Sequence, residues 1–250
     1  MIRKIILRTL AVFVLTVISQ VGGIIYLCCL ASYPFIDKKI SGWLWRGLVK
    51  FSFFITIYVI SIFTVIPLLA KQFGRVRLPI LENNHVKPLL AMTWILNRNY
   101  VTPELRSAVI ESAIEQDNIF PGSTIVYFDA NFPFWNGFPL FPHLSHNDGK
   151  KLDIAFQYRD VFSGLYTADH PSIIGYGVCE EPLEGEVDMP LICDKKGFWQ
   201  YSLLRRIIPQ GDKKKFEFDN ERTSQLIMEL CKNKSVSKVF IEPHLKETWA

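Results

Sequence analysis

Two long apolar runs near the N-terminus limit what this chain can fold into more than any other feature. Neither Thr9 to Ile36 nor Phe51 to Ala70 contains a charged residue. A helix of about 20 residues crosses the ~30 Å hydrocarbon core of a membrane, and both runs are long enough to do so. A cleaved signal peptide is an alternative for the first run, but its apolar part exceeds the usual length. We therefore predict two transmembrane helices, at about residues 9–36 and 51–70, within a membrane anchor formed by residues 1–70.

Basic residues flank both runs and bear on the orientation of this anchor. Three precede the first run, four lie within residues 37–50, and three follow the second run. The positive-inside rule places the more basic loop in the cytoplasm, which favours residues 37–50 by one charge. We therefore expect a protein of the inner (cell) membrane whose C-terminal part is periplasmic or extracellular.

The remainder of the chain is long enough for one folded domain. The sequence has 250 residues, of which 49% are hydrophobic, and we expect a juxtamembrane connector at 71–100 and a single domain at 101–250. The net charge of +4 includes no basic stripe with interleaved aromatic residues, so we expect no nucleic acid partner. The sequence does not indicate an oligomeric state. Two of the five cysteines fall in the first apolar run, and the other three allow at most one disulfide, for which Cys179 and Cys193 are a candidate pair.

Capping residues and hydrophobic periodicity predict the elements of this domain. Thr102 followed by Pro103 is a typical helix start, and Asp219 or Asn220 is a second one. The predicted elements are helices at 102–116, around 199–207 and at 219–233, and strands at 123–128, 152–158 and 236–242. Five aromatic residues and three prolines within residues 131–142 predict an irregular loop. Its rings could line a substrate cleft, cover the core or touch the membrane surface.

A turn between His146 and Asp153 suggests a metal site. Residues 147–150 read Asn-Asp-Gly-Lys, a strong signal for a tight hairpin turn that would bring the imidazole and the carboxylate together. Both groups bind Zn²⁺, and a catalytic zinc typically has three protein ligands and one open position. In isolation such a spacing is more often an ordinary solvated hairpin.

Glu242 and His244 strengthen the metal interpretation. They follow the apolar run at 239–241, and residues two apart on a strand point to the same face. A carboxylate and an imidazole would then lie side by side, so that one could bind the metal while the other handled the proton of a bound water.

The sequence Pro-His-Leu-Ser-His at 142–146, followed by Gly149 and Asp153, resembles the motif of the D-Ala-D-Ala metallopeptidase and penicillin-insensitive murein endopeptidase group. That group shares its zinc fold with lysostaphin-type enzymes and the hedgehog domain. The resemblance covers roughly residues 120–250 and implies an α+β fold with a small antiparallel sheet and flanking helices. It also implies His146, Asp153 and His244 as zinc ligands, Glu242 as general base, and His143 as a catalytic residue that lines the site without necessarily binding metal. The second motif has glutamate where many relatives have histidine, which makes the base assignment less specific.

These observations together predict a membrane-anchored zinc metallopeptidase that hydrolyses peptide bonds of peptidoglycan stem peptides or cross-links. Carboxypeptidase and endopeptidase activity are both compatible with the sequence. Two alternatives stay open: a non-hydrolytic zinc-containing domain of the same fold that binds a peptide or partner protein, and a membrane scaffold without metal in which the histidines are structural.

Overall fold

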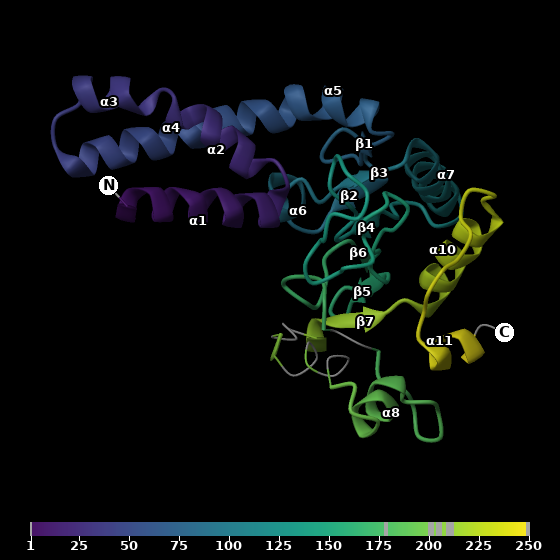
Figure 1. The fold of residues 1–250 in the computed structure, drawn as a ribbon. Coiled ribbons are helices and arrows are strands. Elements are labelled where there is room, and N and C mark those ends of the chain that lie inside the picture. Colours follow the sequence, from purple (N-terminus) through teal and green to yellow (C-terminus); the bar gives the residue numbers. More distant parts are fainter. Residues whose placement is uncertain (1, 178–179, 200–202, 204–206, 209–212, 249–250) are drawn as a thin grey trace. The chain divides into compact units, whose positions relative to one another are not determined.

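The structure, a computed structural model, describes residues 2–177, 180–199, 203, 207–208 and 213–248 (Figure 1). It has an α+β fold with small sheets and flanking helices, as predicted. The chain forms two compact units that interleave along the sequence. Unit 1 comprises Met1–Leu78, Ala91–Arg106 and Asp129–Asp153, and unit 2 comprises Pro79–Leu90, Ser107–Phe128 and Ile154–Ala250. The residues predicted as a connector, 71–100, therefore contribute to both units.

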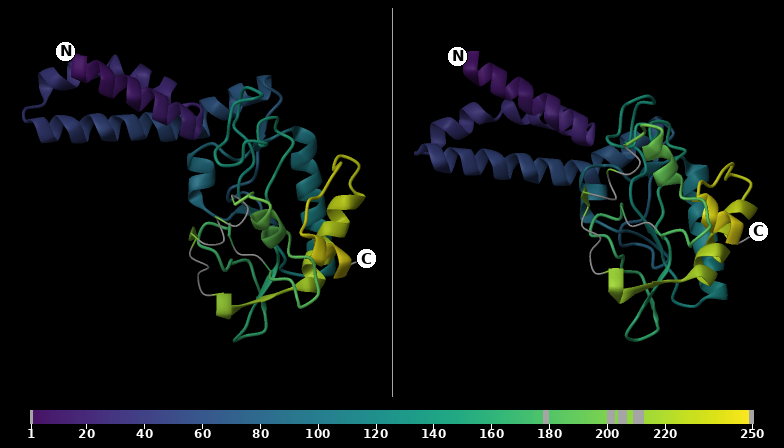
Figure 2. Two further views of the ribbon diagram at one scale, coloured as in Figure 1. Left: turned by 60° about the horizontal axis from the view of Figure 1, so that its bottom comes forward. Right: turned by 90° about the horizontal axis from the view of Figure 1, so that it is seen from below.

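The N-terminal part of unit 1 is helical. Its helices are α1 (Ile2–Ser19), α2 (Gly22–Leu30), α3 (Tyr33–Lys39), α4 (Trp43–Phe63) and α5 (Val65–Gln72). Helix α1 packs on α2, and both α2 and α3 pack on α4, an arrangement that Figure 2 shows from two further sides. Their shared core continues into α5 and consists of Val21, Ile25, Cys29, Tyr33, Tyr58, Ile62, Ile66 and Ala70, with Tyr100 and Phe134 from later segments.

The first apolar run does not form one helix, so the prediction of a transmembrane helix at 9–36 is wrong. The chain reverses between α1 and α2 at Gln20, which is buried and has a left-handed backbone conformation (φ 62°). Close packing after the reversal requires glycine: a Cβ at Gly22 would lie 2.7 Å from the Ser19 hydroxyl, and one at Gly23 would overlap Thr16. A second break at residues 31–32 separates α2 from α3.

Helix α4 is the one helix in the described part of the chain that is long and apolar enough to cross a membrane. The predicted second span at 51–70 therefore begins earlier and ends earlier, at Phe63. Pro67, two residues into α5, explains the break at Thr64, because proline lacks the N–H that a continuous helix would need and clashes with the preceding turn.

The rest of unit 1 is a short scaffold around residues 129–153. Strands β1 (Val76–Arg77) and β3 (Tyr100–Val101) pair antiparallel, and α6 (Ala91–Ile95) lies between them in the sequence. An antiparallel bridge joins Tyr100 to Asn131. This bridge ties the start of the aromatic loop to β3.

Unit 2 contains two small sheets. Strands β2 (Val86–Pro88) and β4 (Ile125–Tyr127) are parallel, whereas β6 (Tyr166–Thr167), β5 (Tyr158–Asp160) and β7 (Phe216–Phe218) form an antiparallel sheet in that order. The 3-10 turn Lys213–Lys215 precedes β7, and the helices are α8 (Met189–Lys195), α10 (Asn220–Lys232) and α11 (Pro243–Thr248). Helix α7 (Pro103–Ile119) begins in unit 1 and continues into unit 2.

Several predicted elements are confirmed. Helix α7 starts after Thr102, whose hydroxyl accepts a hydrogen bond from the Leu105 N–H at 3.4 Å, and Asp219 caps α10 by accepting from the Arg222 N–H at 3.1 Å. The predicted strand at 123–128 corresponds to β4. Most of the helix predicted around 199–207 lies outside the described residues, as does Cys179 of the candidate disulfide.

The strand predicted at 236–242 is wrong. This segment has no regular structure, and the Phe240 side chain is 89% exposed. An apolar run becomes a strand when a neighbouring strand satisfies its backbone, and here no such partner is present among the described residues. His244 consequently lies in the first turn of α11 and not on a strand.

Candidate metal site

Three side chains of unit 1 converge on one point. His143, His146 and Asp153 each offer a ligand atom, and these atoms all lie within 4.8 Å of one another. The Nε2 atom of His146 is 3.3 Å from Oδ1 of Asp153, and Nδ1 of His143 is 3.6 Å from Oδ2 of the same carboxylate. His146 is buried, and the other two are half-buried.

The two carboxylate-to-imidazole distances are close to the separation of ligand atoms around a single tetrahedral ion. Two ligand atoms that each lie about 2.1 Å from a tetrahedral zinc are about 3.4 Å apart. The distances from Oδ1 of Asp153 to His146 and from Oδ2 to His143 both lie close to that separation, so each oxygen faces one imidazole. Two imidazoles and one carboxylate are also a ligand set typical of catalytic zinc, which leaves a fourth position open.

Backbone hydrogen bonds align the segments that carry Arg98, Asp129 and Asp153. The Asp153 N–H donates to the Asp129 carbonyl at 3.0 Å, and the Ala130 N–H donates to the Arg98 carbonyl at 2.7 Å. Residues 98, 129–130 and 153 therefore run side by side, although only isolated bridges form here. The chain then passes through the aromatic loop and returns to the site with His143.

The segment 129–130 also lies behind both histidine rings. The Nδ1 atom of His146 is 2.8 Å from the Ala130 carbonyl, which can only accept, so this nitrogen carries a proton and Nε2 is the nitrogen that faces Asp153. On His143, Nε2 lies 3.8 Å from Oδ2 of Asp129, on the ring edge opposite the nitrogen that faces Asp153. Metal-binding histidines commonly have such a carbonyl or carboxylate behind them, which fixes the ring and its tautomer.

Asp129 and Arg98 were not predicted as part of this site. The guanidinium of Arg98 donates to Asp129 Oδ2 at 2.8 Å and to the Phe141 carbonyl at 2.7 Å, and thus links the carboxylate to the loop that precedes His143. A signal for Asp129 was present, because it directly follows the predicted strand at 123–128. No local signal marks Arg98, which reaches the site through tertiary packing.

The charges at the site affect the two histidines differently. Burial lowers the pKa of His143 below its ordinary value in spite of the neighbouring carboxylates of Asp153 and Asp129. Burial would also lower the pKa of His146, but the hydrogen bond and negative charge of Asp153 outweigh it and raise this pKa above the ordinary value. A cation that replaced the proton would be stabilised by the same carboxylate.

The predicted turn forms, but no paired strands flank it. Gly149 has φ 79°, and its N–H donates to Asn131 Oδ1 at 3.0 Å. The buried guanidinium of Arg75 donates to the Asp148 carbonyl and lies so close to Gly149 that any Cβ there would overlap it. The turn is therefore held by tertiary contacts and not by the hairpin that we predicted, and the strand expected at 152–158 is reduced to a bridge at Ile154 and the start of β5.

Glu242 and His244 belong to unit 2. His244 is buried, and its Nε2 is 2.9 Å from the Glu180 carbonyl. The roles predicted for Glu242 and His244 stay predictions. His143, which we expected to line the site, offers one of the three ligand atoms of the cluster.

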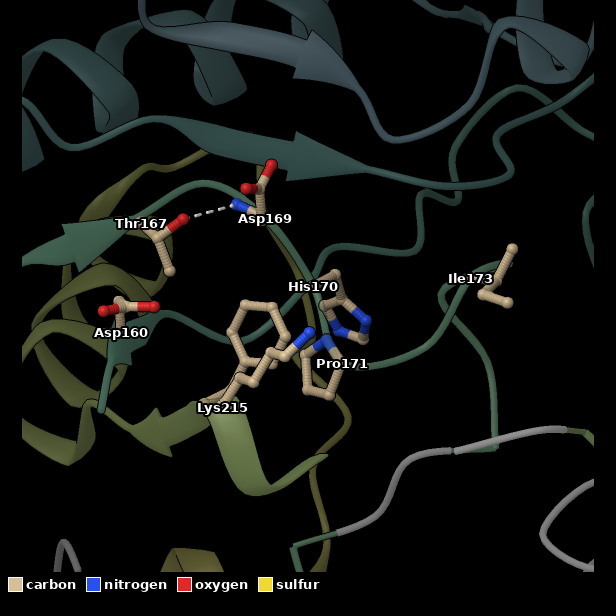
Figure 3. A pocket seen from close by; sticks show the side chains of 8 residues that line it. Asp160, Thr167, Asp169, His170, Pro171, Ile173 and Lys215 are labelled. Carbon is tan, nitrogen blue, oxygen red and sulfur yellow. Dashed lines mark hydrogen bonds between the residues drawn. The ribbon is translucent and has the colours of Figure 1, made fainter. Parts of the chain in front are cut away.

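A separate cavity in unit 2 contains none of the predicted site residues. It has a volume of about 510 Å³, and Figure 3 shows His170, Asp160, Asp169 and Lys215 around it. His170 packs edge-on against Phe128 and Tyr158, and burial lowers its pKa to about 4, although the Ser172 N–H donates to its Nδ1. It is therefore neutral at physiological pH.

Comparisons with protein-family models, with curated proteins and with solved structures find no match to this chain.

Proposed function

We propose that this protein is a membrane-attached, zinc-dependent hydrolase that cleaves peptide bonds in peptidoglycan stem peptides. The observation that carries the proposal is the convergence of His143, His146 and Asp153 within 4.8 Å, with the far edge of each ring turned to residues 129–130. The sequence motif at 142–153 supports the peptide substrate, and the donor set supports zinc.

Each residue of the site has a distinct task in this proposal. His143, His146 and Asp153 would hold the ion, which when bound supplies Lewis-acid polarisation of a carbonyl and a water of lowered pKa. Asp129 and the Ala130 carbonyl keep the two rings in the orientation that presents their lone pairs. Arg98 compensates the charge of Asp129, and Glu242 is the proposed acceptor of the proton that hydrolysis releases.

The distribution of charge supports an extracytoplasmic site. Lys4, near the start of α1, and Arg46 and Lys50, near the start of α4, are all close enough to Asp37 of α3 for their charges to act on its carboxylate. Seven basic residues thus gather at this end of the helices, against three after α4. By the positive-inside rule the seven belong to the cytoplasmic side, so the chain that follows α4 lies on the other side.

Metal analysis of the purified full-length chain in detergent tests the donor set. We expect about one zinc per chain in the wild type, and loss of zinc in His143→Ala, His146→Ala and Asp153→Asn. His85→Ala is the matched control, because His85 is a partly exposed histidine of unit 2 that pairs with Asp117. Equal zinc content in the wild type and in all three site variants would contradict the proposed ligands.

Digestion of purified murein and of free stem peptides, with products identified by mass, tests the reaction. We expect cleavage that a chelator abolishes and added zinc restores. Stoichiometric zinc without cleavage would instead support the alternative of a non-hydrolytic binding domain. Absence of both would leave the membrane scaffold with structural histidines.

A further inference from the structure

We infer that the substrate of this site is held in the membrane: a stem peptide that is still covalently attached to a membrane lipid. The inference rests on the proposed function and names the form in which the substrate is presented. Water adds across the peptide bond to give a carboxylate and an amine, while the lipid attachment stays intact.

The site is coupled to the end of the candidate membrane helix within unit 1. The Tyr58 hydroxyl on α4 donates to the Ile95 carbonyl at 2.7 Å and accepts from Asn97 Nδ2 at 3.0 Å. The next residue along the chain is Arg98, whose guanidinium holds Asp129. Tyr58 lies five residues before the end of α4, a rise of about 7.5 Å, so the segment that supports the site packs on the last turns of this helix.

The aromatic loop provides a second connection. The buried ring of Phe134 belongs to the apolar core that α2, α4 and α5 share, and its N–H donates to Gln20 Oε1 at 2.9 Å in the turn between α1 and α2. The rings of Phe73, directly after α5, and Phe134 are 5.0 Å apart. This loop leads directly to His143, so the membrane-associated helices and the first metal-site histidine share one packed unit.

Large apolar side chains remain exposed along this loop and beside His143. Trp135 is 50% exposed, Phe141 56% and Leu144 54%, and the last two flank His143 within two residues. Exposed large apolar side chains along one loop are costly in water, whereas tryptophan, phenylalanine and leucine are typical anchors at the boundary between headgroups and acyl chains. Phe141 and Leu144 are therefore placed to enter the membrane surface beside the candidate metal site, and Trp135, which packs against Phe73 directly after α5, is placed to enter it along the same loop.

A site in this position favours a substrate that is itself confined to the membrane surface. A lipid-attached peptide is concentrated in the same plane and needs only to extend its polar end to His143, His146 and Asp153. A free peptide gains nothing from the apolar rim, and the bonds of assembled murein must approach the membrane to be cleaved.

Activity on matched substrates tests the inference. The full-length chain, loaded with zinc and reconstituted in lipid vesicles, is given the same stem peptide free and with an N-terminal palmitoyl group. We expect the lipidated peptide to be cleaved with about 10-fold or higher kcat/KM, the gain that partial burial of two apolar side chains would produce. Equal efficiency on the two peptides overturns the inference and leaves the proposed function standing, whereas zinc-dependent cleavage of neither peptide and of no murein overturns both.

Variants of the apolar rim provide a matched control. We expect the double change Phe141→Ser and Leu144→Ser to remove most of the preference for the lipidated peptide, measured as the ratio of kcat/KM on the lipidated peptide to kcat/KM on the free peptide. Phe162→Ser with Leu165→Ser alters two side chains of unit 2 that are 83% and 69% exposed, and should leave the preference intact. Equal effects of the two double variants would overturn the inference.

Fluorescence gives a readout that does not depend on activity. The difference between the wild type and Trp135→Phe isolates the emission of Trp135 from that of the other five tryptophans. In vesicles that contain lipids brominated near the headgroup end of the acyl chains, we expect this emission to be quenched. An unquenched Trp135 in vesicles that do quench the remaining tryptophans would show that the rim stays out of the membrane and would overturn the inference.

Discussion

Substitution of Gly149 by alanine should be among the most damaging small changes in this protein. Gly149 has φ 79°, a conformation that costs an L-residue about 1 kcal/mol. A Cβ there would also overlap the Arg75 guanidinium, which would have to give up its hydrogen bonds to the Asp148 carbonyl and to Asn136 Oδ1. Two hydrogen bonds of a charged group contribute about 1.5 kcal/mol each at the low end of the usual range, so we expect a loss of about 4 kcal/mol in the free energy of unfolding.

Gly74 offers a matched control for this prediction. It has a similar backbone conformation, φ 68°, but a Cβ there would meet no atom within 4 Å. Gly74→Ala should therefore cost only the conformational term of about 1 kcal/mol. For a chain of this size each kcal/mol corresponds to about 2–4 °C in Tm, so thermal unfolding in detergent should separate the two variants by about 6 °C or more.

A double-mutant cycle identifies the cause of the effect. In an Arg75→Ala background the overlap is gone, and Gly149→Ala should cost about as much as Gly74→Ala does. The reasoning is refuted if Gly149→Ala is no more damaging than Gly74→Ala, or if its cost is the same with and without Arg75. Because the turn carries the chain from His146 to Asp153, we also expect Gly149→Ala to weaken zinc binding.

Three further predictions follow from other described residues. Asp219→Ala should lower the free energy of unfolding by about 3 kcal/mol, because it removes the cap of α10 and leaves Arg222 without its fully buried carboxylate partner. Asp188→Ala removes the less buried cap of α8 and should lower this free energy by only about 1 kcal/mol. Similar Tm shifts for the two variants would count against this prediction. The pKa of His170 is about 4 in the folded chain, against an ordinary value of 6.5. Between pH 6.5 and pH 4 the unfolded chain therefore binds more protons at this residue than the folded chain does. The free energy of unfolding should be unaffected by His170 above pH 6.5 and should fall by about 3 kcal/mol as the pH is lowered from 6.5 to 4. A Tm-against-pH profile that is equally steep in His170→Phe would contradict this. Zinc at about 100 times its Kd should raise the free energy of unfolding of the wild type by about 2.7 kcal/mol. The measurement is a rise in Tm that a chelator reverses and that is absent in His146→Ala. A rise of the same size in His146→Ala would show that the metal binds elsewhere.

Local signals in the sequence determined those parts of the protein in which neighbouring residues supply the physical cause. The starts of α7 and α10 follow from Thr102 and Asp219, because a capping side chain satisfies N–H groups only two or three residues away. The proximity of His146 and Asp153 was predictable for a related reason, since a short turn connects them and keeps them close whatever the rest of the chain does.

Tertiary structure decided the rest. The uncharged run at 9–36 has the composition of a single span, but the chain reverses at Gln20, whose side-chain oxygen accepts a hydrogen bond from the Phe134 N–H, more than a hundred residues later. The run at 239–241 has strand-like composition yet has no strand to pair with among the described residues. Asp129 and Arg98 join the candidate metal site through backbone pairing and an ion pair that no local pattern encodes. Composition and capping act over a few residues, whereas hydrogen-bond partners and packing neighbours are chosen among all residues that the folded chain brings into contact.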